Sequence, residues 1–294
     1  MNLLESHRDA DRDARRDLVD ALATTPREGG QVVGLTGPPG VGKSTLAGKL
    51  VAEWRRRGLS VGVIAVDPSS KRSGGAVLGD RSRIAKPPGD DAVFVRSMAA
   101  RDRLGGLAPA TMEAVLVMRA AYDRVLVETV GVGQSETDVS ATADQTIVIV
   151  QPASGDTLQF IKAGLMEVFD LLVVNKGDLG DVAKRTRREL RLALRVLDRA
   201  DTPVVLTSGA TGAGVPELVD ALDARFSALG DGLAALRGHK LREHIVRAVT
   251  ELYGTLHLRT LGGAPSALAR LEALAPDTAP SDLLDALAPA STRR

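Results

Sequence analysis

Residues 34–45 read Gly-Leu-Thr-Gly-Pro-Pro-Gly-Val-Gly-Lys-Ser-Thr, and Gly37 to Ser44 match the phosphate-binding pattern G-x-x-x-x-G-K-[ST] in full. Glycines in this loop let backbone N–H groups turn inward around a phosphate, where a Cβ would clash. A strand pattern precedes the motif and a helical pattern follows it, which is the context that such a loop requires. Lys43 is expected to reach the β- and γ-phosphates as a catalytic group. The expected phosphate-binding residues are Gly37, Pro38, Pro39, Gly40, Val41, Gly42, Lys43, Ser44 and Thr45.

Short runs rich in β-branched residues extend on both sides of this loop. They occupy residues 31–37, 61–67, 92–97, 124–130, 145–151, 171–175 and 203–208. Nearly continuous hydrophobicity over five to seven residues indicates strands that are buried on both faces. Helical patterns separate most of the strands, at 43–57, 109–121, 157–169, 181–200 and 216–229. The sequence therefore predicts an α/β fold of the P-loop NTPase class, with a mostly parallel, doubly wound sheet and ligands at the carboxyl ends of its strands.

Both ends of the chain differ in composition from this α/β core. Residues 1–28 predict a polar helical extension, residues 29–229 the nucleotide-binding domain, and residues 230–294 a helical C-terminal region. In this last region a helical stripe of apolar residues needs a surface to cover it. We interpret the region as a dimerisation arm, and packing onto its own domain is the alternative. The stripe consists of Leu241, Ile245, Val249, Leu252 and Leu256.

The composition excludes several classes of protein. Lys and Arg number 38 and Asp and Glu 37, so the net charge of +1 gives no global attraction to nucleic acid or to an anionic membrane. The absence of Cys excludes disulfides, thiolate catalysis and Cys-ligated metals. No apolar run approaches the ~20 residues that span a bilayer, and the N-terminus lacks a signal core. We expect a cytoplasmic protein without a nucleic-acid or membrane partner.

One basic stretch, residues 184–199, contains seven Lys and Arg residues. Leu190, Leu194 and Leu197 mark an apolar stripe along the same stretch. We interpret it as a crossover helix whose basic side is solvated, not as a nucleic-acid patch.

A second motif, Asn175-Lys-Gly-Asp178, follows the sixth predicted strand and fits N-K-x-D. The carboxylate of Asp178 can accept from the ring N–H and the amino group of guanine, a donor pair that adenine does not offer. Lys176 can lay its stem along the base, and Asn175 can tie this loop to the phosphate loop. After the next strand, a backbone N–H of Ser208, Gly209 or Ala210 can meet the guanine carbonyl oxygen. The sequence therefore predicts GTP and GDP as ligands.

Three carboxylates lie at strand ends or in the loops that follow strands: Asp67, Asp80 and Glu128. Mg²⁺ takes few protein ligands and prefers oxygen, so these carboxylates and the Ser44 hydroxyl predict its surroundings. Gly131 can offer its N–H to the γ-phosphate, which makes residues 132–136 a nucleotide-sensitive switch. Either Asp67 or Gln134 can orient the attacking water. No residue is identifiable as an arginine finger, so we expect slow GTP hydrolysis without a partner.

The chain resembles the MeaB/ArgK family of P-loop GTPases over about residues 30–215. The resemblance rests on GPPGVGKST, AVDPSSKRSGGAVLGDRSR, VETVGVGQSE, SGDTLQFIKAGLMEVFDLLVVNKGDL and TSGATGAGV. It implies a G domain of the SIMIBI class, a homodimer, and a GTP-gated chaperone of an adenosylcobalamin-dependent acyl-CoA mutase such as methylmalonyl-CoA mutase. It also implies that Ser44, Asp67, Asp80 and Glu128 surround Mg²⁺, and that residues 155–159 with Lys162 form a further switch. Gly177 departs from the family pattern, which has Ala there.

Two other functions compete with this one. A small-molecule kinase of the arginine type needs an acceptor pocket with a general base, and no His lies in any of the nucleotide motifs. A nickel-insertion GTPase needs clustered soft or imidazole ligands. The chain has no Cys, and its four His residues do not form i, i+4 pairs: His7, His239, His244 and His257.

Overall fold

The computed structural model describes residue 4 and residues 9–24, 30–68, 89–100, 109–129, 139–152 and 169–290. Within these ranges the chain forms a seven-stranded sheet in the order β3-β2-β4-β1-β5-β6-β7, with every neighbouring pair parallel. This confirms the predicted α/β, P-loop type of sheet. The strands are β1 (Gln31–Thr36), β2 (Val61–Pro68), β3 (Val93–Ala100), β4 (Arg124–Thr129), β5 (Gln145–Val150), β6 (Leu171–Val174) and β7 (Val204–Leu206).

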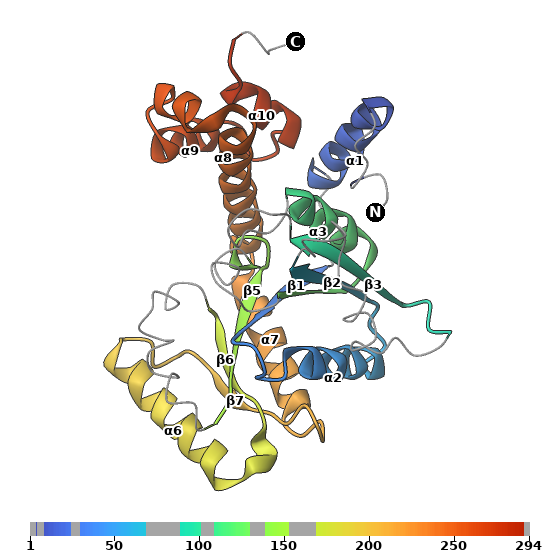
Figure 1. Ribbon diagram of the computed structural model, residues 1–294, viewed down its shortest axis with the longest axis vertical. Helices are drawn as coiled ribbons and strands as arrows, with labels where there is room; N and C mark the ends of the chain where they lie inside the picture. Colours follow the sequence, from blue (N-terminus) through green and yellow to red (C-terminus); the bar gives the residue numbers. More distant parts are fainter. Residues whose placement is uncertain are drawn as a thin grey trace.

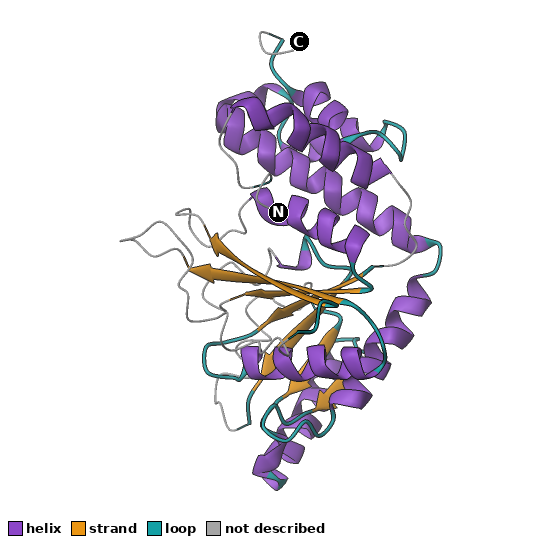
Figure 2. Cartoon of the chain, turned by 90° about the vertical axis from the view of Figure 1, so that its right-hand side faces the viewer, coloured by secondary structure: helices purple, strands orange, loops and turns teal. Residues whose placement is uncertain are grey.

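Helices cover both faces of the sheet, as Figure 2 shows with the strands in orange between purple helices. In chain order they are η1 (Asp9–Asp11), α1 (Arg12–Thr24), α2 (Lys43–Arg56), α3 (Pro109–Ala121), η3 (Gly177–Leu179), α6 (Asp181–Val196), α7 (Val215–Leu229), α8 (Gly232–Thr260), α9 (Ala264–Glu272) and α10 (Pro280–Leu287). The helix predicted over 157–169 falls almost wholly outside the described residues.

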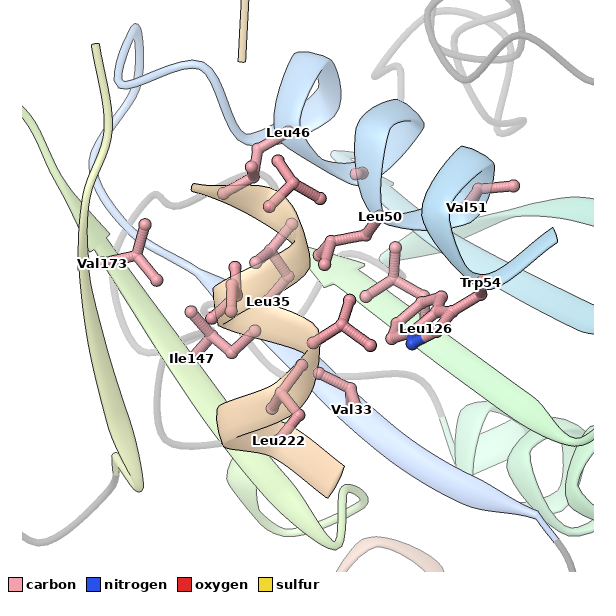
Figure 3. Packing of buried hydrophobic residues seen from close by; sticks show 14 of the residues in the cluster. Val33, Leu35, Leu46, Leu50, Val51, Trp54, Leu126, Ile147, Val173 and Leu222 are labelled. Atoms are coloured by element: carbon pink, nitrogen blue, oxygen red, sulfur yellow. The ribbon is translucent and has the colours of Figure 1, made fainter. Parts of the chain in front are cut away.

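The core on one face lies between the sheet and helices α2 and α7. Leu35 of β1 and Ile147 of β5 face Leu50 of α2 and Leu222 of α7, and Trp54 closes the far end (Figure 3). All five side chains are fully buried. Burial of each such side chain contributes about 1.5–3 kcal/mol, so this layer fixes the position of α2 against the sheet. The start of α2 is therefore held rigidly at the end of β1.

The opposite face is covered by α3 and α1 at one side and by α6 at the other. Alternate residues of the strands supply these contacts, because successive side chains of a strand point to opposite faces. Val32 and Val127 belong to the cluster under α1 and α3, whereas Val148 and Leu172 belong to the cluster under α6. Central strands buried on both sides explain the nearly continuous hydrophobic runs in the sequence.

The C-terminal helices α8, α9 and α10 form a smaller cluster with a core of its own, drawn at the top of Figure 1. The first part of α8 is attached to the sheet domain by Arg237, whose guanidinium donates two bonds of 2.7 Å to the buried carboxylate of Asp144. Lys240 donates to the carbonyl of Ser140 at 2.6 Å. The start of α10 is bonded to α1, because the Ser281 backbone N–H donates to Asp20 at 3.0 Å.

Two details of the predicted apolar stripes are wrong. Leu252 and Leu256 are exposed, and Gly254, whose angles are non-helical (φ 81°, ψ 165°), breaks α8 between them, so the five predicted residues do not form one continuous helical stripe. Leu197 is also exposed, because α6 ends at Val196 and the following residue leaves the helix. Within the described ranges, no helix combines the length and apolar character needed to cross a bilayer.

Candidate functional site

The phosphate loop connects β1 to α2 and depends on glycine at two contacts. Gly37 has φ 148°, and a Cβ there would lie 2.4 Å from the carbonyl oxygen of Ile149. Gly42 has φ 91°, and a Cβ there would lie 2.6 Å from Nδ2 of Asn175. A positive φ disfavours residues with a side chain, and both contacts leave no room for one. The two glycines thus allow the loop to pass directly over β5 and over Asn175, which begins the predicted base loop.

Lys43 begins α2, and its side chain folds back over the loop. Its ammonium donates to the carbonyls of Gly37 at 2.8 Å and Pro38 at 3.0 Å. The residue is only 8% exposed. A largely buried ammonium places a positive charge inside the concave side of the loop, where an anion gains most from it.

The N-terminus of α2 adds to this positive potential. Gly42 is the N-cap, and it has no side chain that can bond the first backbone N–H groups of the helix. These N–H groups and the helix dipole favour an anion at this end. Together with Lys43 they give the loop the chemistry of a phosphate site.

The predicted metal residues Ser44 and Glu128 meet at the ends of neighbouring elements. The Ser44 hydroxyl donates to Oε1 of Glu128 at 2.7 Å, and Glu128 is 7% exposed. β1 and β4 are paired side by side, which brings the start of α2 and the end of β4 together. A hydroxyl and a carboxylate beside a phosphate loop are the hard oxygen ligands that Mg²⁺ prefers, so these residues fit the ion.

The remaining predicted metal and switch residues lie outside what the structure describes. Asp67 belongs to β2 and pairs in register with Ala99, but its side chain is not among the described groups. Asp80, Gly131 and Gln134 lie in undescribed ranges, and so does the predicted further switch at 155–159 with Lys162.

Asn175 joins the phosphate loop to both loops of the predicted base site. It follows β6 directly, and it is 2% exposed. Its Nδ2 donates to the carbonyl of Val41 at 2.8 Å, while its Oδ1 accepts from the backbone N–H of Gly209 at 2.9 Å and from the Thr207 hydroxyl at 3.3 Å. One buried amide therefore fixes three loops relative to one another.

Asp178 lies in the turn after Asn175 and is exposed to solvent. The Ser208 hydroxyl donates to its Oδ1 at 2.6 Å. This bond lowers the pKa of Asp178, helped by a backbone N–H and by the charge of Lys176. The carboxylate is thus ionised at neutral pH and held facing the β7 loop, as an acceptor of hydrogen bonds must be.

Lys176 occupies the left-handed region with φ 56°. Its ammonium donates to the side-chain oxygen of Gln151 at 2.6 Å. Sequence reasoning missed Gln151, although its position directly after β5 puts it at the same edge of the sheet as the other site residues. Gly177 is closely confined, since a Cβ there would lie 3.0 Å from the carbonyl of Thr207.

The sheet order, the glycine loop and the joined base loops define the fold of a P-loop GTPase. Among solved structures, a LAO/AO transport system kinase superposes with a TM-score of 0.67 at 29% identity, covering 97% of this chain and 89% of that chain. The hydrogenase maturation factor HypB from Archaeoglobus fulgidus gives a TM-score of 0.52 at 18% identity, covering 72% of this chain and 98% of that chain. The second likeness concerns the fold alone.

A family model described as methylmalonyl Co-A mutase-associated GTPase MeaB matches residues 1–256. The chain belongs to the MeaB family. A protein named as a GTPase in Pyrococcus horikoshii is 51% identical over 194 residues, 64% of this chain and 61% of its own length. A protein of Mus musculus named methylmalonic aciduria type A homolog, mitochondrial, is 40% identical over 65% of this chain and 48% of its own length. The match thus spans about three fifths of the archaeal relative.

Proposed function

We propose that this protein binds GTP with Mg²⁺ and hydrolyses it to GDP and phosphate. The observation that carries the proposal is the Asn175 side chain, which bonds the phosphate loop at Val41 and the base loop at Gly209. This arrangement sets a fixed spacing between a phosphate site and a carboxylate suited to guanine, which is what a nucleotide with both parts requires.

The proposed roles combine the geometry of the described residues with the sequence motifs. Residues 37–45 hold the phosphates, with Lys43 stabilising the charge that develops on the transferred group. Ser44 and Glu128 hold Mg²⁺ directly or through water, joined by Asp67 and Asp80, and the ion neutralises phosphate charge when bound. The attacking water is oriented by Asp67 or Gln134, and Gly131 donates to the γ-phosphate.

The base is read by the paired loops after β6 and β7. Asp178 accepts from the guanine ring N–H and amino group, and the stem of Lys176 lies along the ring. The Gly209 N–H already bonds Asn175, so the exposed Ala210 offers the N–H for the guanine carbonyl. Ser208 holds Asp178 in place.

The base assignment is tested by calorimetry with GDP and ADP in the presence of Mg²⁺. Wild-type protein should bind GDP much more tightly than ADP. Asp178→Asn should reduce this preference at least about tenfold, because the NH₂ group of the new amide would face the N–H donors of guanine. Asp181→Asn is the matched control, since Asp181 is exposed three residues further on and pairs only with Lys184 among the described contacts. An unchanged preference in Asp178→Asn would show that another group reads the base.

The biological partner that we propose is an adenosylcobalamin-dependent acyl-CoA mutase, with methylmalonyl-CoA mutase, which the family description names, as the first candidate. In this role GTP binding and hydrolysis gate the loading, protection or repair of the mutase cofactor. The test is GTP turnover with and without the purified mutase: a several-fold stimulation supports the proposal, and equal rates contradict it.

We further propose a homodimer and a division into residues 1–28, 29–229 and 230–294. The exposed Leu252 and Leu256, which lie on either side of the Gly254 kink in α8, support the dimer, because neither belongs to a hydrophobic core cluster of the described residues. Light scattering should give twice the monomer mass for the wild type and a monomer for Leu252→Asp/Leu256→Asp. A wild-type monomer at micromolar concentration would refute the interpretation of residues 230–294 as a dimerisation arm.

A further inference from the structure

The outward side of α6 carries apolar and positively charged side chains in one compact patch. We define the α6 patch as Arg188, Leu192, Arg195 and Val196. At 100° per residue these four side chains lie on the side of the helix opposite to Leu190 and Leu194, which are fully buried against the sheet. Figure 1 shows α6 in yellow at the end of the molecule away from α8, α9 and α10.

Apolar exposure is concentrated around this helix. Among the described residues, nine large hydrophobic side chains are exposed, and five of them lie between residues 179 and 197. Leu192 is 50% exposed and Val196 is 83% exposed. A solvated helix face gains nothing from such side chains, whereas clustered exposed apolar groups are typical of a surface that a partner covers. This face therefore has a composition that the solvated interpretation of the basic stretch does not explain.

The charges of the patch are left uncompensated by the helix itself. Lys184 pairs with Asp181 at 3.2 Å, and Arg185 pairs with Glu189 at 2.9 Å. Within the described part of the chain, the guanidinium groups of Arg188 and Arg195 have no carboxylate in ion-pair range. Two unpaired guanidinium groups thus flank the exposed Leu192.

We propose that the α6 patch docks an acidic protein surface in which carboxylates surround an apolar recess. Arginine binds carboxylates through two parallel bonds, and Arg is enriched at protein interfaces around buried apolar centres. Nucleic acid is the weaker fit, because Leu192 and Val196 gain nothing against phosphates and the patch has no aromatic ring for stacking. The inference rests on the proposed function in one respect: the docked protein is the acyl-CoA mutase.

The position of the patch connects it to the base loop. α6 begins at Asp181, three residues after Asp178, and η3 fills the short connection. The backbone N–H of Lys184 donates to the carbonyl of Gly180 at 3.2 Å, so the first turn of α6 is continuous with this connection. The patch begins at Arg188, about 10 Å along the helix from its first residue, so a bound protein would influence the guanine site through the shared first turn of α6.

The experiment measures binding of the mutase to the full-length protein loaded with GDP or a non-hydrolysable GTP analogue. The mutase comes from the organism that encodes this chain. The test variant is Arg188→Glu/Arg195→Glu, with Leu192→Ser as an uncharged second variant. The control is Arg259→Glu/Arg270→Glu, which makes the same charge change on exposed residues of the C-terminal helices. Basal GTP turnover and thermal unfolding should be unchanged in all three variants.

We expect Arg188→Glu/Arg195→Glu to weaken mutase binding at least tenfold. The control Arg259→Glu/Arg270→Glu should weaken it by less than twofold. Wild-type binding should also weaken as salt rises, because exposed charges are screened. Binding within twofold of wild type in both patch variants overturns this inference and leaves the proposed function intact. A wild-type protein that does not bind the mutase overturns both. The choice of a protein partner is overturned if the wild type binds duplex DNA in a salt-sensitive way and only Arg188→Glu/Arg195→Glu loses this binding.

Discussion

Asn175→Ala is the substitution that tests the architecture of the site most directly. The wild-type amide accepts from the Gly209 N–H at 2.9 Å and donates to the Val41 carbonyl at 2.8 Å. Both bonds lie in the interior, because Asn175 is 2% exposed and Val41 is 1% exposed. Alanine removes both partners while β6 and its apolar contacts remain.

The expected cost follows from the groups that are left behind. A buried polar group that loses its partner costs about 1–3 kcal/mol, and here the Gly209 N–H and the Val41 C=O lose theirs, while the Thr207 hydroxyl can rotate toward another acceptor. We therefore expect the free energy of unfolding to fall by roughly 2–6 kcal/mol, with the lower end reached if a water enters the space. GDP affinity should fall as well, since the phosphate loop and the base loop lose their common anchor.

Urea denaturation of nucleotide-free protein measures the first effect, and calorimetry with GDP measures the second. Asp178→Ala is the control, because Asp178 is exposed and bonds the Ser208 side chain. That variant should lose guanine preference and lose much less stability than Asn175→Ala, because its carboxylate is exposed and, among the described side chains, only the Ser208 hydroxyl loses an acceptor. If Asn175→Ala unfolded as wild type does, or if both variants lost the same stability, the anchoring argument would be refuted.

Three further predictions concern other parts of the chain. Lys43→Ala should abolish tight nucleotide binding, and submicromolar affinity for GTP in equilibrium dialysis would contradict the phosphate site. Gly254→Ala should lower the free energy of unfolding by about 1–3 kcal/mol, because φ 81° and ψ 165° suit only glycine; unchanged urea stability would show that the kink is not required. Hydrogen bonds from Arg56 and Arg57 lower the pKa of Glu53 to about 2. The ionised carboxylate therefore adds to the free energy of unfolding above pH 4.5, and this stabilisation is lost as the pH falls through 2. Glu53→Gln should therefore flatten the fall in stability between pH 4.5 and 2, and identical acid titrations of the two proteins would count against the ion pairs.

The sequence predicted the sheet well, because the strands depend on local patterns. The strand runs are hydrophobic on both faces, so β1 and β5 are recognisable without knowledge of their neighbours. The contacts Ser44–Glu128 and Asn175–Val41 follow from a general property of parallel sheets, whose strand ends meet at one edge.

Other features depend on long-range packing that periodicity does not contain. The kink at Gly254 was not predicted, because a glycine inside a helical pattern is ordinarily tolerated at a cost of about 1 kcal/mol. The ion pair of Arg237 with Asp144 joins residues 93 positions apart, and no local motif marks either partner. The solvated interpretation of the basic stretch used the apolar stripe of Leu190, Leu194 and Leu197, whereas the exposed Leu192 and Val196 become informative only when the exposure of each side chain of α6 is known.

The two halves of the site differ in how their polar groups are bonded, and this difference bears on how the nucleotide acts. In the base half, Asn175 and Asp178 are bonded to Gly209 and Ser208, so the loops that we propose to contact guanine are preorganised. In the phosphate half, the Lys43 ammonium bonds backbone carbonyls of its own loop, and phosphate oxygens can replace these acceptors. Guanine recognition should therefore need little rearrangement, whereas the phosphates exchange one set of bonds for another. Structural differences between the GTP and GDP states should then begin at the phosphate loop and at Glu128, and reach α6 only through the rigid base loops.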